Sequence, residues 1–192
     1  MADEEMWILA SSSPRRHALL REAGIAFTAV APEVEEWDNR SHPELSPQEL
    51  VLANARRKGM AVWRGGEPRP ILAADTLVVC EGRVMGKPAN LEEAAEMLRW
   101  LSGRTHEVIT GVVCVRGKEI RETVVRTRVT FRTLDEAGIG DYLARVHVLD
   151  KAGGYALQEE GARIIERIEG SRSNVVGLPM EKVLNWWRQG SG

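Results

Sequence analysis

The stretch ILAADTLVVC, residues 71–80, is an apolar run interrupted by a single carboxylate, that of Asp75. A short apolar run bounded by turn residues is typical of a strand, and the sequence predicts one over 71–79 that turns at Glu81-Gly82. A carboxylate inside such a strand is costly unless it is paired or binds a metal ion. Asp75 is therefore either a structural residue, bonded to the backbone or to a lysine, or part of a functional site.

Strand and helix patterns alternate on both sides of this run. Before it, the sequence predicts strands over 7–10 and 27–31, a helix over 14–23, and a helix from the capping box Ser46-Pro47-Gln48-Glu49 to residue 63. After it, the sequence predicts a helix over 91–101 capped by Asn90, a hairpin of strands 108–116 and 120–133, a helix from a Thr133–Glu136 capping box to residue 145, a strand over 162–168 and a helix over 179–188. The pattern indicates a mixed α/β sheet with helices on its faces, in one domain over 1–192.

Composition narrows the class of protein. The chain has 192 residues, of which 43% are hydrophobic, and a net charge of −2. This charge gives no overall attraction to nucleic acid or to an anionic membrane, so neither is expected as a partner. The acidic start MADEEMW does not resemble a signal peptide, and no apolar run has the length of a membrane span. Cys80 and Cys114 each lie in an apolar stretch, which predicts two buried free thiols in a cytoplasmic protein.

The stretch SSSPRR, residues 11–16, has the pattern of a helix start with an unusual charge. Ser13 suits the N-cap and Pro14 the first helical position. Arg15 and Arg16 then occupy the first turn, where positive charge opposes the helix dipole at a cost of some tenths of a kcal/mol each. The pattern makes sense if the hydroxyls of Ser11 and Ser13, the backbone N–H groups and both guanidinium groups converge on a phosphate. The alternative is an exposed cap whose arginines fold back onto acidic neighbours.

Three further segments carry polar groups on predicted loops. They are MGKP at 85–88, which presents Lys87, DKAGGYALQ at 150–158, which contains Lys151 and Gln158, and GSRSNVVGLP at 170–179. Each also has a plain interpretation, as a surface lysine on a hairpin, a glycine turn or a loop leading into the last helix. None of these segments is specific by itself.

Taken together and in this order, LASSSPRR, AADTLVV, GKP, LSGRTHEVITGV, DKAGGYALQ and NVVGLP closely resemble the Maf family of nucleoside triphosphate pyrophosphatases. The resemblance spans nearly the whole chain. It implies an elongated mixed β-sheet with flanking helices and two lobes around a cleft, similar to inosine triphosphate pyrophosphatase. It also implies a cytoplasmic enzyme, commonly a homodimer, that binds a nucleoside triphosphate and needs a divalent metal ion, Mg²⁺ or Mn²⁺.

The resemblance further implies roles for individual residues. The phosphate-facing cations of the family correspond to Arg15, Arg16, Lys58 and Lys87. Its acidic pair, which holds the metal ion, corresponds to Glu36 and Asp75, with Asp75 as the proton acceptor for a water that attacks the α-phosphorus. The choice of Glu36 stays open, because Glu33, Glu35 and Asp38 crowd the same loop.

Substrate choice is also implied by the resemblance. The dTTP/UTP pyrophosphatase subgroup has a threonine after the aspartate and a glutamine closing the glycine-rich motif, here Thr76 and Gln158, with Arg15 as a third specificity position. Lys151 belongs to the same motif and is expected to bind substrate. An amide such as Gln158 offers a donor and an acceptor to the edge of uracil or thymine. The alternatives are a 7-methyl-GTP pyrophosphatase and a non-catalytic nucleotide-binding regulator of septum formation.

Overall fold

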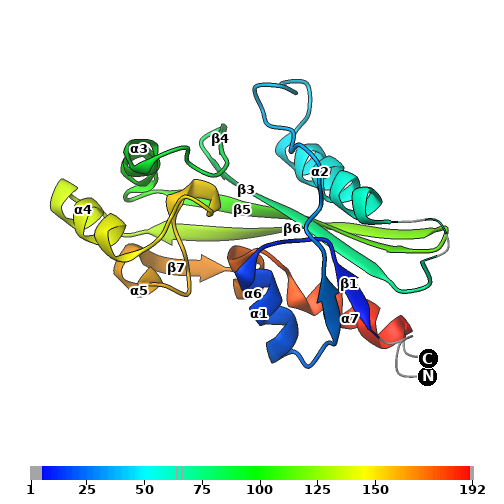
Figure 1. Cartoon of the computed structure of the whole chain (residues 1–192). Helices are drawn as coiled ribbons and strands as arrows, with labels where there is room; N and C mark the ends of the chain where they lie inside the picture. Colours follow the sequence, from blue (N-terminus) through cyan, green and yellow to red (C-terminus); the bar gives the residue numbers. More distant parts are fainter. Residues whose placement is uncertain (1–5, 64, 66, 191–192) are drawn as a thin grey trace. The chain divides into compact units, whose positions relative to one another are not determined.

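The computed structural model describes residues 6–63, 65 and 67–190. The acidic start MADEE and part of the loop rich in glycine and proline before residue 71 therefore lie outside the described residues. The described chain forms a seven-stranded mixed sheet in the order β2-β1-β3-β5-β6-β7, with β4 paired to β3, and helices flank the sheet (Figure 1). This confirms the predicted mixed α/β class.

The elements follow the predicted order closely. The strands are β1 (Trp7–Leu9), β2 (Phe27–Ala29), β3 (Ile71–Cys80), β4 (Arg83–Met85), β5 (Thr105–Arg116), β6 (Glu119–Phe131) and β7 (Ile165–Glu169). The helices are α1 (Pro14–Glu22), α2 (Pro47–Val62), α3 (Leu91–Leu101), α4 (Glu136–Arg145), α5 (Gly161–Ile164), α6 (Arg172–Val176) and α7 (Met180–Gly190), with a 3₁₀ turn at Ala152–Gly154. None of the helices in the described part of the chain combines the length and the apolar character needed to span a bilayer.

The chain divides into two compact units. Unit 1 contains residues 1–75, 110–125 and 177–192, and unit 2 contains residues 76–109 and 126–176. The strands β3, β5 and β6 contribute residues to both units, and the division on β3 falls between Asp75 and Thr76. The expectation of a single domain over 1–192 stays a prediction.

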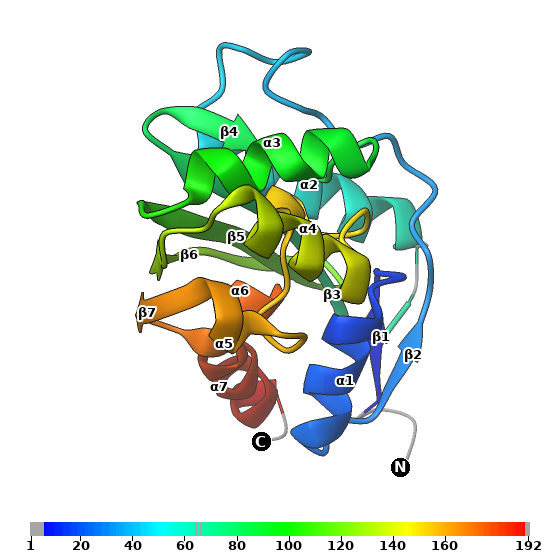
Figure 2. The same cartoon turned by 90° about the vertical axis from the view of Figure 1, so that its left-hand side faces the viewer.

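Unit 1 has helices on both faces of its part of the sheet. The strand β1 pairs in parallel with β2 and with β3. Helix α2 covers one face, while α1 and α7 lie on the other (Figures 1 and 2). Under α2, buried apolar side chains from β1, β3, β5 and α2 itself form a core of Ile8, Ala10, Ala55, Ile71, Ala73, Val113 and Val115. On the other face, the rings of Trp187 in α7 and Trp7 in β1 lie 5.4 Å apart.

Helix α2 is fixed at its start and along its length. The predicted capping box is confirmed: the Glu49 N–H donates to Ser46 Oγ, and the Ser46 N–H donates to the Glu49 carboxylate at 2.8 Å. The helix then approaches β5 closely at Gly111, where a Cβ atom would lie 2.7 Å from the backbone of Val51. A side chain at residue 111 would therefore push α2 away from the sheet.

Unit 2 packs α3 and α4 on a core of its own, which contains several aromatic residues. Asn90 caps α3 as predicted, since its side chain accepts from the Glu93 N–H at 2.9 Å. The rings of His106, Phe131 and Tyr155 meet edge to face, with centroids 4.8 to 5.4 Å apart. Such contacts contribute beyond the apolar area that they bury.

Two local predictions are wrong. Helix α4 is capped by Asp135, whose carboxylate accepts from the Gly138 N–H at 2.7 Å, and not by Thr133. Residues 162–164 belong to the short helix α5 instead of a strand, because Glu160 adopts a left-handed conformation at φ 54° and starts a helical turn there. The sequence also did not predict β4 or α6 as separate elements. Cys80 and Cys114 are buried free thiols, as predicted.

Candidate active site

The stretch SSSPRR forms the start of α1, with Ser13 at the N-cap and Pro14 at the first helical position. In the part of the chain that is described, the Ser13 side chain makes no capping hydrogen bond. The backbone N–H of Ser13 donates to Ser11 Oγ at 3.2 Å. The Arg15 side chain is half-buried and that of Arg16 is buried. Arg16 therefore does not fit the alternative of an exposed cap.

The Arg16 guanidinium is held by contacts at both ends of the sequence. Its Nε donates to the Gly177 carbonyl at 2.8 Å, and its Nη1 donates to Ser11 Oγ at 3.3 Å. Burial lowers the pKa of Arg16, while the nearby carboxylates of Asp75 and Glu36 act in the opposite direction. An arginine stays protonated at neutral pH in spite of such a shift. A fixed positive charge thus lies within electrostatic reach of both predicted catalytic acids.

Asp75 and Glu36 converge on one ammonium group. Lys58 Nζ, on α2, lies 2.7 Å from Asp75 Oδ1 and 2.8 Å from Glu36 Oε1. Asp75 and Lys58 are only 5% and 6% exposed, whereas the Glu36 side chain is 41% exposed. A buried carboxylate and a buried ammonium each lose hydration, and this loss is offset when they bond to each other. The pairing with Lys58 explains how Asp75 is accommodated inside an apolar strand.

The crowded acidic loop between β2 and α2 presents Glu36 to this cluster. The Asp38 carboxylate accepts from the Ser41 N–H at 2.7 Å and from the Arg40 N–H at 3.1 Å, which closes a local turn. These bonds lower the pKa of Asp38, and those from Ser41 have the largest effect. Glu36 is the acid that bonds to Lys58. Its role in catalysis stays a prediction.

Asn54 belongs to the same cluster, and the sequence reasoning missed it. It is 2% exposed and its Nδ2 donates to Asp75 Oδ2 at 3.0 Å. One signal in the sequence points to it. Asn54 precedes Lys58 by four residues, so the two polar side chains lie on the same face of α2. That face also carries Val51 and Ala55, which are buried.

Three of the predicted residues of unit 2, Lys87, Lys151 and Gln158, lie on two segments that are joined to each other, and Thr76 lies on β3. The Gly153 N–H donates to the Gly86 carbonyl at 3.0 Å, which links the glycine-rich loop to the segment that carries Lys87. Lys87 and Gln158 are exposed, and Thr76 is half-buried. Substrate contacts by these three residues stay predictions.

Lys151 is occupied within its own loop. Its side chain is buried, and its Nζ bonds to the His147 carbonyl, to Asp150 at 2.9 Å and to Glu159 at 3.3 Å. These contacts stabilise the loop conformation. A contact between Lys151 and substrate also stays a prediction.

Tyr155 anchors the middle of the same loop. Its hydroxyl hydrogen-bonds to His106 Nε2 at 2.8 Å, and both side chains are buried. Burial lowers the pKa of His106 to about 4, so the imidazole is neutral at pH 7. The next residue, Ala156, donates its N–H to the Tyr142 hydroxyl at 2.9 Å. The loop that ends at Gln158 is therefore fastened to the core of unit 2.

The predicted metal site is a pair of carboxylates. Within the described residues, no group of three or more His, Cys, Asp or Glu side chains is arranged to hold a metal ion. Mg²⁺ is commonly bound by one or two carboxylates together with water and substrate phosphates. Asp75 and Glu36, which already meet at a single cation, fit that pattern.

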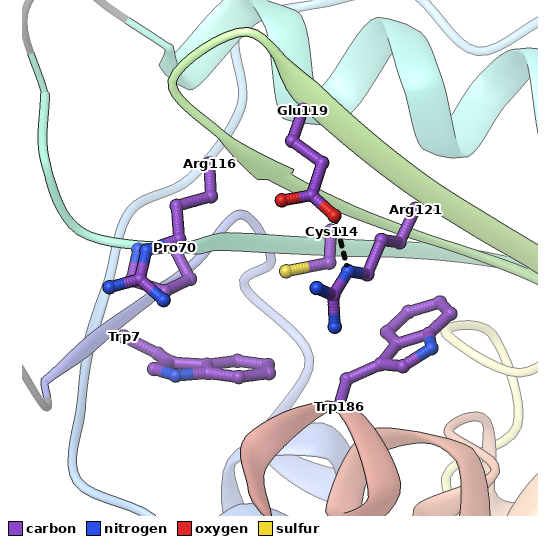
Figure 3. Close-up of a pocket in the computed structure, with 7 residues that line it drawn as sticks. All are labelled: Trp7, Pro70, Cys114, Arg116, Glu119, Arg121 and Trp186. Carbon is purple, nitrogen blue, oxygen red and sulfur yellow. Dashed lines mark hydrogen bonds and ion pairs between the residues drawn. The ribbon is translucent and has the colours of Figure 1, made fainter. Parts of the chain in front are cut away.

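A separate small hollow, with a volume of about 30 Å³, lies in unit 1 (Figure 3). Its lining in the described chain is Trp7, Pro70, Cys114, Arg116, Glu119, Arg121 and Trp186. The Arg121 guanidinium pairs with Glu119 at 2.7 Å, and burial raises the pKa of the Cys114 thiol to about 12. A thiol with such a pKa is a poor nucleophile at neutral pH. The predicted site residues are not among this lining.

The site of this α/β protein thus places the Arg16 cation, at the start of α1, next to two carboxylates that share Lys58. The family model of Maf-like proteins matches residues 6–189, and the chain belongs to this family. The resemblance carried by the six motifs is thus confirmed.

Individual relatives extend over almost the whole chain. One from Akkermansia muciniphila is 47% identical over 177 residues, which are 92% of this chain and 92% of the relative. One from Bacillus cereus strain ATCC 10987 is 42% identical over 182 residues, which are 95% of this chain and 88% of the relative. One from Bacillus anthracis strain CDC 684 shows the same identity over 94% of its own length. All three are named dTTP/UTP pyrophosphatase.

Proposed function

We propose that this protein hydrolyses dTTP and UTP to the nucleoside monophosphate and pyrophosphate. The observation that carries the proposal is the convergence of Asp75 and Glu36 on Lys58 next to the buried Arg16. This arrangement supplies positive charge for phosphates and carboxylates for water in one place. The 42–47% identity to near full-length relatives of that name supports the choice of reaction and substrate.

Cations neutralise the substrate before it reacts. A triphosphate repels an attacking water through its negative charge, and preorganised cations remove this barrier. We assign this task to Arg16 and Lys58 at the acidic cluster, and to Arg15 and Lys87. The Arg16 guanidinium is already fixed by Gly177 and Ser11, so little reorganisation is needed when phosphate binds.

Asp75 is the residue that accepts a proton. In the proposed reaction a water oxygen attacks the α-phosphorus while its proton passes to the Asp75 carboxylate. The bond from the α-phosphorus to the oxygen that bridges to the β-phosphorus breaks, and pyrophosphate leaves. Lys58 and Asn54 both contact Asp75 and hold its carboxylate in one orientation. Proton transfer to a base positioned in this way contributes about 10²- to 10⁴-fold to a rate.

Asp75 and Glu36 are also the residues that would hold a divalent metal ion, Mg²⁺ or Mn²⁺. Such an ion supplies Lewis-acid stabilisation of the phosphoryl oxygens when it is bound. The homodimer and the cytoplasmic location stay proposals that rest on the resemblance to the Maf family, and the mass in solution tests the first of them.

Base selection is assigned to Gln158 and Thr76. The Gln158 amide offers one donor and one acceptor, which the edge of uracil or thymine can satisfy together. Gln158 is exposed in the free protein, and a bound base would cover it. A covered base that leaves this amide without a partner loses about 1–3 kcal/mol, or roughly ten- to hundredfold in selectivity. This pairing is what separates the proposed substrates from purine nucleotides.

A panel of nucleotides tests the proposal. Pyrophosphate release from dTTP, UTP, ATP, GTP and 7-methyl-GTP is measured with Mg²⁺ and with Mn²⁺, and the monophosphate product is identified. We expect kcat/KM for dTTP and UTP to exceed the other values by tenfold or more. A preference for 7-methyl-GTP would overturn the choice of substrate, and nucleotide binding without release of pyrophosphate would overturn the enzymatic function.

A further inference from the structure

We propose that Asn54 is a positioning residue that fastens the loop carrying Glu36 to Asp75. The inference rests on the proposed function of this cluster. Asn54 lies on α2, one helical turn before Lys58, and its side chain is enclosed between the acidic loop and β3. Lys58 joins the two carboxylates through their charges, whereas Asn54 joins the backbone behind Glu36 to the side chain of Asp75.

Three hydrogen bonds define the contact. The Trp37 N–H donates to Asn54 Oδ1 at 2.8 Å, and Asn54 Nδ2 donates to the Trp37 carbonyl at 2.8 Å. The same Nδ2 donates to Asp75 Oδ2 at 3.0 Å. The orientation of the amide is dictated by its partners. A flipped amide would oppose donor to donor at the Trp37 N–H, and acceptor to acceptor at the Asp75 carboxylate.

The backbone that Asn54 binds is that of Trp37, the residue that follows Glu36. The segment between β2 and α2 consists of turns and irregular backbone, so its position depends on side-chain contacts. Asn54 satisfies both polar groups of the Trp37 backbone. The Trp37 ring is flanked by the Arg57 guanidinium, 4.5 Å from the ring centroid, and by the His42 ring at 3.9 Å. Trp37 is thus fixed by backbone and ring, and Glu36 beside it is directed to Lys58.

An asparagine suits this position better than residues of similar size. Aspartate would keep the acceptor for the Trp37 N–H, but it would lose both donors and place a second carboxylate against Asp75. Leucine would leave the Trp37 N–H, the Trp37 carbonyl and Asp75 Oδ2 without this partner. The loss at Asp75 is the most unfavourable of these, because that bond is buried and the carboxylate oxygen cannot readily bond to water instead.

Hydrogen exchange tests the positioning without any turnover. Deuterium uptake of peptides covering residues 33–42 is compared in the parent, in Asn54→Leu and in Asn54→Asp. The aspartate variant keeps the shape of the side chain, and it serves as the test if the leucine variant does not fold. Asn185→Leu, a change of the same type at an exposed residue of α7, is the matched control. We expect exchange at least tenfold faster in the Asn54 variants and unchanged in the control. Unchanged exchange in a folded Asn54 variant would overturn the proposal.

A double-mutant cycle with Glu36→Gln tests the consequence for catalysis. We expect Asn54→Leu to lower kcat/KM for dTTP about ten- to hundredfold in the parent, since small displacements of reacting groups are costly. In the Glu36→Gln background the same change should cost clearly less than in the parent, because the carboxylate on the loop has already been removed and only the bond from Asn54 to Asp75 is still lost. Equal losses in both backgrounds would overturn the positioning role. A parent that releases no pyrophosphate would overturn the proposed function alone, since the exchange measurement still decides whether Asn54 holds the loop.

Discussion

Substituting Gly111 by alanine should separate α2 from the sheet that it covers. A Cβ atom at residue 111 would lie 2.7 Å from the carbonyl group of Val51 and 2.8 Å from the Leu52 nitrogen. These are backbone atoms of a helix, so no side-chain rotation relieves the overlap. The helix must move by roughly 0.7 Å before ordinary contact at 3.4 Å is reached. We therefore expect Gly111→Ala to be tolerated only with a displaced α2.

The size of the effect follows from the packing. Overfilling a close-packed interface typically costs about 1–3 kcal/mol in the free energy of unfolding. For a chain of this length that corresponds to a fall in Tm of about 2–4 °C per kcal/mol. Activity should suffer more than stability, because α2 carries Asn54 and Lys58 and β3 carries Asp75. A shift of this size between the groups of a catalytic site can cost on the order of a hundredfold in rate.

Gly59, which lies on α2 and faces the same sheet, offers a matched control. A Cβ atom there would meet Ala73 and Val115 at 3.5 and 3.6 Å, which is ordinary contact. Alanine is also favoured over glycine inside a helix by about 0.8–1.0 kcal/mol, so Gly59→Ala should raise the stability. Urea unfolding and pyrophosphate release would be measured for both variants. The reasoning is refuted if Gly111→Ala matches the parent in both measurements, or if the two alanine variants behave alike.

Three further predictions address the acid, the base-selecting loop and the buried imidazole. Asp75→Asn should lower pyrophosphate release by at least about a hundredfold in a protein that still folds, as seen by circular dichroism, because the proton acceptor is lost; near-normal release would contradict this role. Gln158→Glu should reduce the preference for dTTP and UTP over purine nucleotides in kcat/KM, because the side chain keeps its size and loses its donor; an unchanged preference would exclude Gln158 as the residue that reads the base. His106 has a pKa near 4 in the folded protein and about 6.5 when unfolded, so the unfolded state takes up the proton first as the pH falls. The contribution of neutral His106 to the free energy of unfolding should be complete above pH 6.5 and should decline by about 3 kcal/mol toward pH 4. Urea unfolding of the parent and of His106→Asn across this range should show a steeper loss of stability in the parent. Parallel stability curves for the two proteins would refute the prediction.

Local features of the fold were predictable from sequence where a hydrogen bond closes within a few residues. The caps at Ser46 and Asn90 are of this kind, because the side chain and the N–H that it accepts from are three residues apart. The predicted cap of α4 is wrong, although it rests on the same kind of short-range bond. Thr133 and Asp135 are both good cap residues, and only the backbone conformation of the folded chain decides between them.

The candidate site depended on contacts that cross the chain. The cost of burying Asp75 indicates that its carboxylate needs a partner, and a lysine is one of the partners that the sequence predicts. The sequence could not show that Lys58, 17 residues away, supplies the charge, because this depends on which face of α2 meets β3. Asn54 was missed for that reason, although its spacing from Lys58 placed both residues on one helical face. The choice of Glu36 from a loop with several acids required the resemblance, and the contact with Lys58 is what sets it apart in the structure.

The bond between Arg16 and Gly177 joins residues 161 positions apart, and it has a consequence for how the protein is made. Synthesis proceeds from the N-terminus, so SSSPRR leaves the ribosome long before its partner exists. The segment after residue 176 that belongs to unit 1, including α7 with Trp187, is synthesised after every residue of unit 2. Unit 2 has all of its residues while the apolar strand β1 still lacks α7. A polypeptide that stops before residue 177 therefore lacks the carbonyl group to which Arg16 Nε donates, and its strand β1 lacks the cover of α7.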